Sequence, residues 1–179
     1  MRKNLGKNSR KFILSFLGSL TTAAIFYGGG NYINKQTPYY NFFSNFISDL
    51  GRTTSHSGDD NTISLSFFII GMLIQVFGAF YFLYNAADYF KSDKPKVTIL
   101  AKISAAIGSI SLLGVILTPA DVPSLYFLHI LFANSVFNCS FVTLSIYGYL
   151  FYTKGLKNVT YSLLLLSLIH ISEPTRQVQ

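Results

Sequence analysis

The apolar residues of this chain are gathered in long blocks, and these blocks constrain its fold more than any other feature. A helix needs roughly 20 consecutive apolar residues to cross the hydrocarbon core of a bilayer. Blocks of about that length run from Phe12 to Gly30, Ile63 to Tyr84, Val97 to Leu117 and Leu125 to about Tyr149. Only 12% of the residues are charged, against about 25% in soluble domains. The sequence therefore predicts an all-α fold, a polytopic bundle of transmembrane helices.

A fifth apolar run begins at Val159 and stops early, so we expect four complete spans and a truncated fifth. The segment from Leu166 to Arg176 resembles the translation of a transposase-type sequencing adapter. On that interpretation, residues 1–165 form a single membrane domain and residues 166–179 are a non-native tail. His170 and Glu173 are therefore set aside as candidate site residues.

The lysines and arginines that flank the apolar blocks predict the orientation of the chain. Ten of them lie in the N-terminal segment and in the loops after the second and fourth blocks, whereas the first loop has only Lys35 and Arg52 and the third has none. Cytoplasmic loops carry the excess of positive charge. We therefore expect a multi-pass protein of the cell membrane with a cytoplasmic N-terminus. The net charge of +7 is a topology signal and does not indicate nucleic-acid binding.

Inside the predicted bundle, one helix face and one charged pair are expected to have structural roles. Ala101, Ala105 and Ser109 recur at helical spacing, and small residues let helices approach closely in lipid. Lys102 lies near the inner end of the third block, where its side chain can reach the interface. Asp88, at the inner end of the second block, is its predicted partner.

The first outer loop contains a periodic apolar segment. From Tyr39 to Leu50, apolar residues recur at the spacing of an amphipathic helix. Aromatic residues favour the membrane interface. We therefore expect a short interfacial helix on the outer leaflet, with Asp49 and Arg52 at its end. The polar segment that follows, TTSHSGDDN, favours a mobile loop around His56.

Four ionisable residues are expected on the outer side. Asp49 and Arg52 end the predicted interfacial helix, Asp121 lies in the turn after the third block, and His129 lies about one helical turn into the fourth. Ionisable groups within membranes are costly and usually face the bundle interior or a cavity. We therefore predict an outward-facing polar pocket formed by these four. Two alternatives stay open: a local Asp49–Arg52 salt bridge, and a neutral His129 hydrogen-bonded in the core.

Such a pocket favours a non-enzymatic protein that binds a membrane lipid or a small polar ligand. One alternative is an intramembrane hydrolase with a metal held by His129 and acidic residues, and another is a small transporter. His56, Asp59 and Asp60 have no recognised ligand spacing, so no metal site is assigned. The chain has no phosphate loop, nucleotide fingerprint or nucleophile elbow, so no catalytic residue or cofactor is assigned. A homo-oligomer stays open.

Two short motifs carry a family resemblance. The segment NFISDLGR, from Asn45 to Arg52, follows an N-terminal span, and the pattern Gly114, Pro119-Ala-Asp121 and His129 follows later. Together they resemble an uncharacterised bacterial and archaeal family of integral membrane proteins, a domain-of-unknown-function family grouped with the DRAM/FRAG-like proteins. The resemblance implies a sixth helix after the fifth, and this chain departs from the family by lacking that last part. It also implies that Asp49, Arg52, Asp121 and His129 are the matching positions, and it implies no settled biochemical activity.

Overall fold

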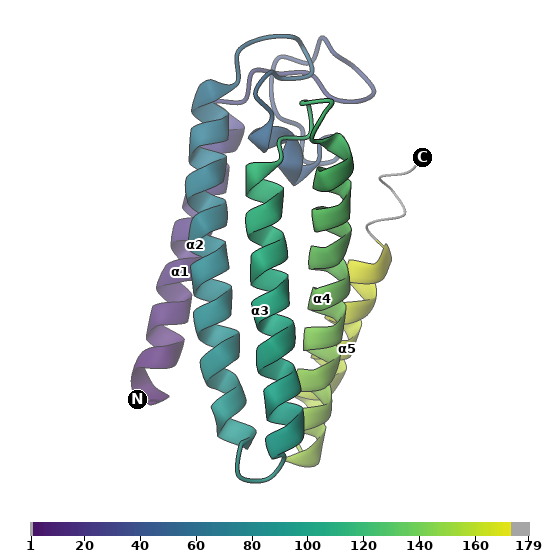
Figure 1. Cartoon of the computed structure of the whole chain (residues 1–179). Coiled ribbons are helices and arrows are strands. Elements are labelled where there is room, and N and C mark those ends of the chain that lie inside the picture. Colours follow the sequence, from purple (N-terminus) through teal and green to yellow (C-terminus); the bar gives the residue numbers. More distant parts are fainter. Residues whose placement is uncertain (1, 173–179) are drawn as a thin grey trace. The chain divides into compact units, whose positions relative to one another are not determined.

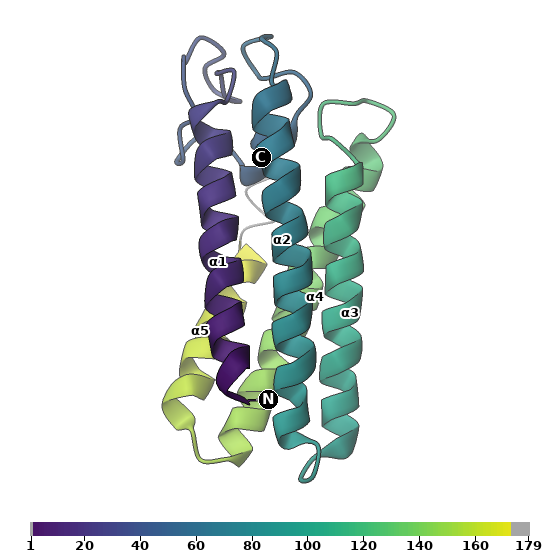
Figure 2. The same cartoon turned by 90° about the vertical axis from the view of Figure 1, so that its left-hand side faces the viewer.

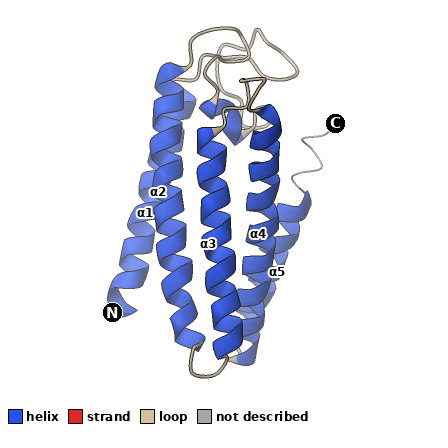
Figure 3. Cartoon of the chain, in the orientation of Figure 1, coloured by secondary structure: helices blue, strands red, loops and turns tan. Residues whose placement is uncertain are grey.

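A computed structural model describes residues 2–172, and this part of the chain is helical, with no strand (Figures 1 and 3). The predicted all-α class is confirmed. The helices are α1 (Arg2–Ile25), η1 (Ile47–Gly51), α2 (Thr62–Ala87), η2 (Asp88–Phe90), α3 (Pro95–Leu117), α4 (Tyr126–Thr153) and α5 (Lys157–Ser172), where η marks a 3₁₀ helix.

Three helical segments among the described residues are long and apolar enough to cross a membrane. They are Thr62–Phe90 with 29 residues, α3 with 23 and α4 with 28. At about 1.5 Å per residue, each exceeds a hydrocarbon core of roughly 30 Å. The 16 described residues of α5 do not reach that length, and α1 opens with a polar, basic segment. Four complete spans and a truncated fifth therefore stay a prediction.

The first apolar block is helical only in part. α1 begins at Arg2 and ends at Ile25, so Gly28 to Gly30 lie outside the helix. Gly29 has a φ of 101° and Gly30 a φ of 76°. Residues other than glycine rarely adopt such φ angles, because their Cβ atom would approach the backbone too closely. The glycines therefore end the helix and turn the chain into the first loop.

The described residues belong to two compact units. Of these, unit 1 comprises residues 2–78 and 113–130, and unit 2 comprises residues 79–112 and 131–172. In unit 1, α1 packs closely against α2 (Figure 2). A Cβ atom added at Gly71 would lie 3.0 Å from the Cβ of Ser19, and one at Gly78 would lie 2.7 Å from that of Phe12. Glycine therefore permits the close approach of these two helices.

Unit 2 has its own core of buried residues: Ala87, Phe90, Ala101, Tyr147 and Leu150. The Tyr147 hydroxyl donates to the Leu83 carbonyl, and the Thr143 hydroxyl donates to that of Ser104 at 3.0 Å. Hydrogen bonds between helices add to packing where hydrophobicity alone does not hold helices together. The predicted Lys102–Asp88 pair is confirmed, with Nζ 2.7 Å from Oδ1.

The predicted amphipathic helix from Tyr39 to Leu50 is wrong, because the structure has only the short η1 helix there. The Asn41 side chain accepts from the Phe43 amide at 2.9 Å, and the Asn45 side chain accepts from the Asn41 amide at 3.0 Å. Asparagine side chains that bind nearby amides offer the backbone an alternative to helical hydrogen bonds. Asn41 and Asn45, which lie between the apolar positions of the predicted helix, therefore stabilise a series of turns instead.

Candidate functional site

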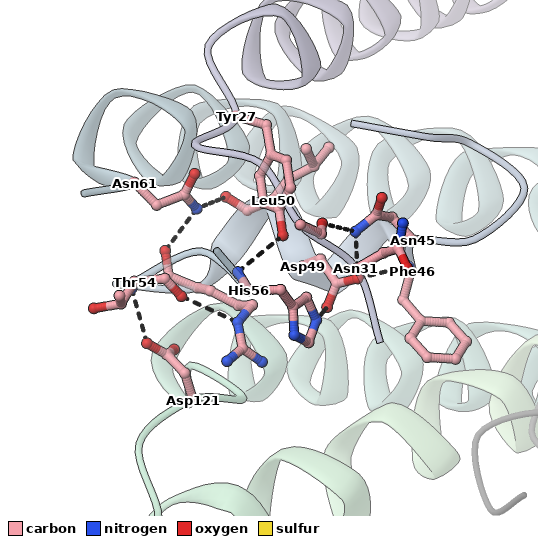
Figure 4. A network of polar contacts seen from close by, with 12 residues as sticks. Tyr27, Asn31, Asn45, Phe46, Asp49, Leu50, Thr54, His56, Asn61 and Asp121 are labelled. Atoms are coloured by element: carbon pink, nitrogen blue, oxygen red, sulfur yellow. Dashed lines mark hydrogen bonds and ion pairs between the residues drawn. The ribbon is translucent and has the colours of Figure 1, made fainter. Parts of the chain in front are cut away.

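The first loop of unit 1 is held together by Asn61, whose side chain is only 1% exposed. Its amide nitrogen donates to the Leu50 carbonyl at 3.3 Å and to the Arg52 carbonyl at 2.9 Å. Its side-chain oxygen accepts from the Gly28 amide at 3.2 Å. One buried side chain therefore joins the glycine segment after α1, the end of η1 and the start of α2, and Figure 4 shows its bond to Leu50.

Residues 53–60 form a compact, hydrogen-bonded turn where the sequence favoured a mobile loop. The Ser55 amide donates to the Asp59 carbonyl at 3.0 Å. The Ser57 hydroxyl donates to the Gly28 carbonyl at 2.8 Å, and the Ser57 amide donates to the Gly29 carbonyl at 3.2 Å. The turn is therefore attached to the glycine segment that ends α1.

Asp49 is buried, with 4% of its surface exposed, and its partner is His56. The Nε2 atom of His56 lies 3.0 Å from Oδ1 of Asp49 (Figure 4). Oδ2 accepts from the Asn45 side chain at 3.2 Å and from the Phe46 amide at 2.9 Å. Both carboxylate oxygens are therefore used by protein donors, as buried acids require.

The charge of Asp49 acts on a neighbouring phenol. Burial and the nearby Asp49 carboxylate together raise the pKa of Tyr40 to about 12. Both effects disfavour the phenolate, because burial removes water from the charged form and a like charge repels it. Tyr40 therefore stays neutral across the physiological range.

Asp121 binds the first loop from the turn between α3 and α4. Its carboxylate accepts from the Thr53 amide at 3.0 Å, from the Thr53 hydroxyl at 2.5 Å and from the Thr54 amide at 2.9 Å. Burial alone would raise the pKa of Asp121, but these donors favour the charged form, and the net effect lowers it. Asp121 therefore acts as a carboxylate that holds two amides of unit 1.

His129 closes the same turn from within α4. It is 6% exposed, and its Nδ1 donates to the Thr118 carbonyl at 2.5 Å. The Thr118 hydroxyl in turn donates to the Gly114 carbonyl at 2.7 Å. This arrangement corresponds to the alternative in which His129 is a hydrogen-bonded core histidine.

Arg52 pairs with neither predicted acid. Its Nε donates to the Thr54 carbonyl at 3.1 Å, and the side chain is partly exposed. Among the described residues, no carboxylate lies within ion-pair distance of the guanidinium, because Asp49 binds His56 and Asp121 binds the threonines. The alternative of a local Asp49–Arg52 salt bridge is therefore wrong.

The structure thus joins Asp49, Arg52 and Asp121 through the backbone and polar side chains of one loop, and not by direct pairing. His56 and Asn61 were missed as members of this network. Asn61 lies just before Thr62 and the second apolar block, a position where an asparagine often begins a helix, and only this feature of the sequence pointed to it.

The described side chains offer no ready metal site. No three of their His, Cys, Asp and Glu side chains are grouped closely enough to hold an ion. His170 and Glu173, which were set aside as adapter-derived, have side chains outside the described residues. The metal-dependent hydrolase therefore gains no support from this part of the chain.

Comparisons with known proteins add no relative. No protein-family model matches the chain, and no curated protein or solved structure is significantly similar to it. The resemblance to the DRAM/FRAG-like family stays a prediction, and function has to be argued from the loop network itself.

Proposed function

We propose that this chain is a multi-pass integral membrane protein that binds an anionic group through Arg52, on the outer side of the cell membrane. The anion is the phosphate or carboxylate of a lipid headgroup or of a small polar ligand. Three helical segments of membrane-spanning length support the membrane location. The excess of lysine and arginine in the N-terminal segment supports a cytoplasmic N-terminus.

The observation that carries the proposal is the uncompensated charge of Arg52. The two acids of the predicted pocket are occupied by other donors: Asp49 by His56, and Asp121 by Thr53 and Thr54. Only Nε of the guanidinium has a protein acceptor among the described residues, which leaves the two terminal nitrogens for a ligand. A guanidinium binds carboxylates and phosphates through two parallel hydrogen bonds.

The backbone around Arg52 is held in place before any ligand binds. The Arg52 carbonyl accepts from Asn61, and the amides of Thr53 and Thr54 donate to Asp121. The side chain itself is oriented by the bond from Nε to the Thr54 carbonyl. A group that is already ordered loses less entropy on binding, so more of the interaction energy appears as affinity.

Native mass spectrometry of the purified protein tests this proposal. Wild type, Arg52→Gln and Arg52→Lys would be titrated with phosphatidylglycerol, phosphatidylcholine and free glycerol phosphate. A charged hydrogen bond contributes about 1.5–3 kcal/mol, so we expect Arg52→Gln to bind the anionic ligand at least roughly tenfold more weakly. The affinity of Arg52→Lys should be intermediate, because lysine keeps the charge but cannot make the two parallel hydrogen bonds of a guanidinium.

Lys35→Gln is the matched control, since Lys35 is the other cation of the first loop and is exposed. In the titration with free glycerol phosphate, Lys35→Gln should bind like wild type. The lipid and free-phosphate arms distinguish a headgroup from a soluble ligand. Equal anion binding by wild type and Arg52→Gln in both arms would refute the proposal.

A further inference from the structure

A cluster of exposed apolar side chains lies in the first loop of unit 1. We call it the aromatic patch, and it consists of Tyr39, Phe42, Phe43, Phe46 and Ile47. Phe43 is 97% exposed and Phe42 is 73% exposed, and the other three are between 38% and 60% exposed. Large apolar side chains gathered at one exposed place mark a binding surface for a protein or a membrane.

Hydrogen bonds hold the patch in this exposed arrangement. The Asn41 side chain accepts from the Phe43 amide, and the Asn45 side chain accepts from the Asn41 amide and donates to the Gly30 carbonyl at 2.9 Å. Next to the patch, buried Asp49 accepts from the Phe46 amide. The backbone of the patch is thus tied to polar side chains, of which Asn45 and Asp49 are buried.

The charge of the surrounding segment suits a lipid surface. Residues 31–48 contain no acidic residue, and Lys35 is their one cation. Aromatic rings concentrate at the level of the lipid headgroups, where they are partly in hydrocarbon and partly in water. A basic residue beside them is attracted to anionic lipid.

Exposed apolar side chains also occur at the helix ends on either side of the first loop. Ile25 at the end of α1 is 72% exposed, Phe26 is 51% exposed, and Ile63 at the start of α2 is 52% exposed. These residues lie at the two points where the loop joins its helices. In a membrane, the lipid that covers these helix ends lies next to the loop that connects them.

We infer that the aromatic patch inserts into the outer leaflet of the bilayer and anchors the first loop there. Phe42 and Phe43 reach the region of the glycerol and upper acyl chains, while Lys35 stays among the headgroups. This inference rests on the proposed membrane orientation and is independent of anion binding by Arg52.

Tryptophan fluorescence tests the inference with little background, because the chain contains no tryptophan. Phe43→Trp would be reconstituted into vesicles that contain phospholipids brominated on the acyl chains. We expect blue-shifted emission, strong quenching by the brominated lipid and weak quenching by aqueous acrylamide. Ser92→Trp, in an exposed turn of unit 2, is the control and should show the opposite pattern.

Two results would overturn the inference. Emission from Phe43→Trp that is quenched by acrylamide and unaffected by brominated lipid would mean that the patch lies in water. Protection from both quenchers would mean that a protein surface, such as a second copy of the chain, covers it. Phe42→Trp provides an independent reporter if Phe43→Trp does not fold. Phe43→Trp combined with Arg52→Gln should keep the lipid quenching, which separates this inference from the anion site.

Discussion

Asn61 should contribute more to the stability of unit 1 than any exposed polar residue of the loop. Replacing it with alanine removes three hydrogen bonds, to Gly28, Leu50 and Arg52. Each contributes about 0.5–1.5 kcal/mol net. The Leu50 carbonyl still accepts from the Ser64 hydroxyl at 3.1 Å, so the loss of its bond from Asn61 is partly offset. The Gly28 amide and Arg52 carbonyl lose this partner, and we expect Asn61→Ala to lower the free energy of unfolding by about 3 kcal/mol.

Asn61→Asp distinguishes the donor role from the acceptor role. An aspartate still accepts from the Gly28 amide, but it places a charge against the Leu50 and Arg52 carbonyls at a position that is 1% exposed. Burial, together with the two carbonyl oxygens that face it, raises the pKa of the new carboxyl above its unfolded value of about 3.9. The folded state then favours the protonated form, so this variant should lose stability as the pH rises from about 4 to 8.

Reversible unfolding in mixed micelles, followed by circular dichroism during titration with sodium dodecyl sulfate, measures both effects. Asn158→Ala is the matched control, because Asn158 is exposed near the start of α5, and it should stay within about 0.5 kcal/mol of wild type. An Asn61→Ala variant as stable as this control would refute the role assigned to Asn61.

Two further predictions concern the same loop. The pKa of Asp121 is lowered in the folded protein. The contribution of Asp121 to stability should therefore be present above the unfolded pKa of about 3.9 and be lost as the pH falls through the folded pKa. Asp121→Asn should weaken this part of the pH dependence in micelle unfolding curves. Gly30→Ala should destabilise by about 1–3 kcal/mol or more, because φ is 76° and the added Cβ would lie 2.4 Å from the Ser57 nitrogen. Gly6→Ala, in an open position of α1, should instead stabilise by up to about 1 kcal/mol in the same assay, and equal effects of the two substitutions would contradict the account.

The helical class could be predicted because it depends on local composition. Three of the apolar blocks correspond to helices long enough to cross a membrane. The length of an apolar block can be read from the sequence without knowing which residues pack against it. The Lys102–Asp88 pair could be predicted for a related reason. Both residues lie near a short turn between consecutive helices, so topology alone brings them together.

The structure of the first loop could not be predicted from periodicity. Asn41 and Asn45 fit the polar face of a helix, and the same side chains bind backbone amides in the turns that form instead. A hydrophobic pattern does not distinguish these two uses of an asparagine. The Asp49–His56 pair depends on how η1 and the following turn are placed, and sequence spacing alone did not indicate it.

The most direct test of the central claim is to observe the Arg52 guanidinium during ligand binding. The chain has four arginines, so ¹⁵N NMR of the guanidinium groups gives few signals, and Arg52→Lys assigns the one from Arg52. With a short-chain phosphatidylglycerol, the terminal nitrogens of Arg52 should shift in a saturable way and rotate more slowly. Phosphatidylcholine should leave them unchanged. An Arg52 signal that responds to neither lipid nor free phosphate, or that shifts no more than the other arginines, would contradict the account.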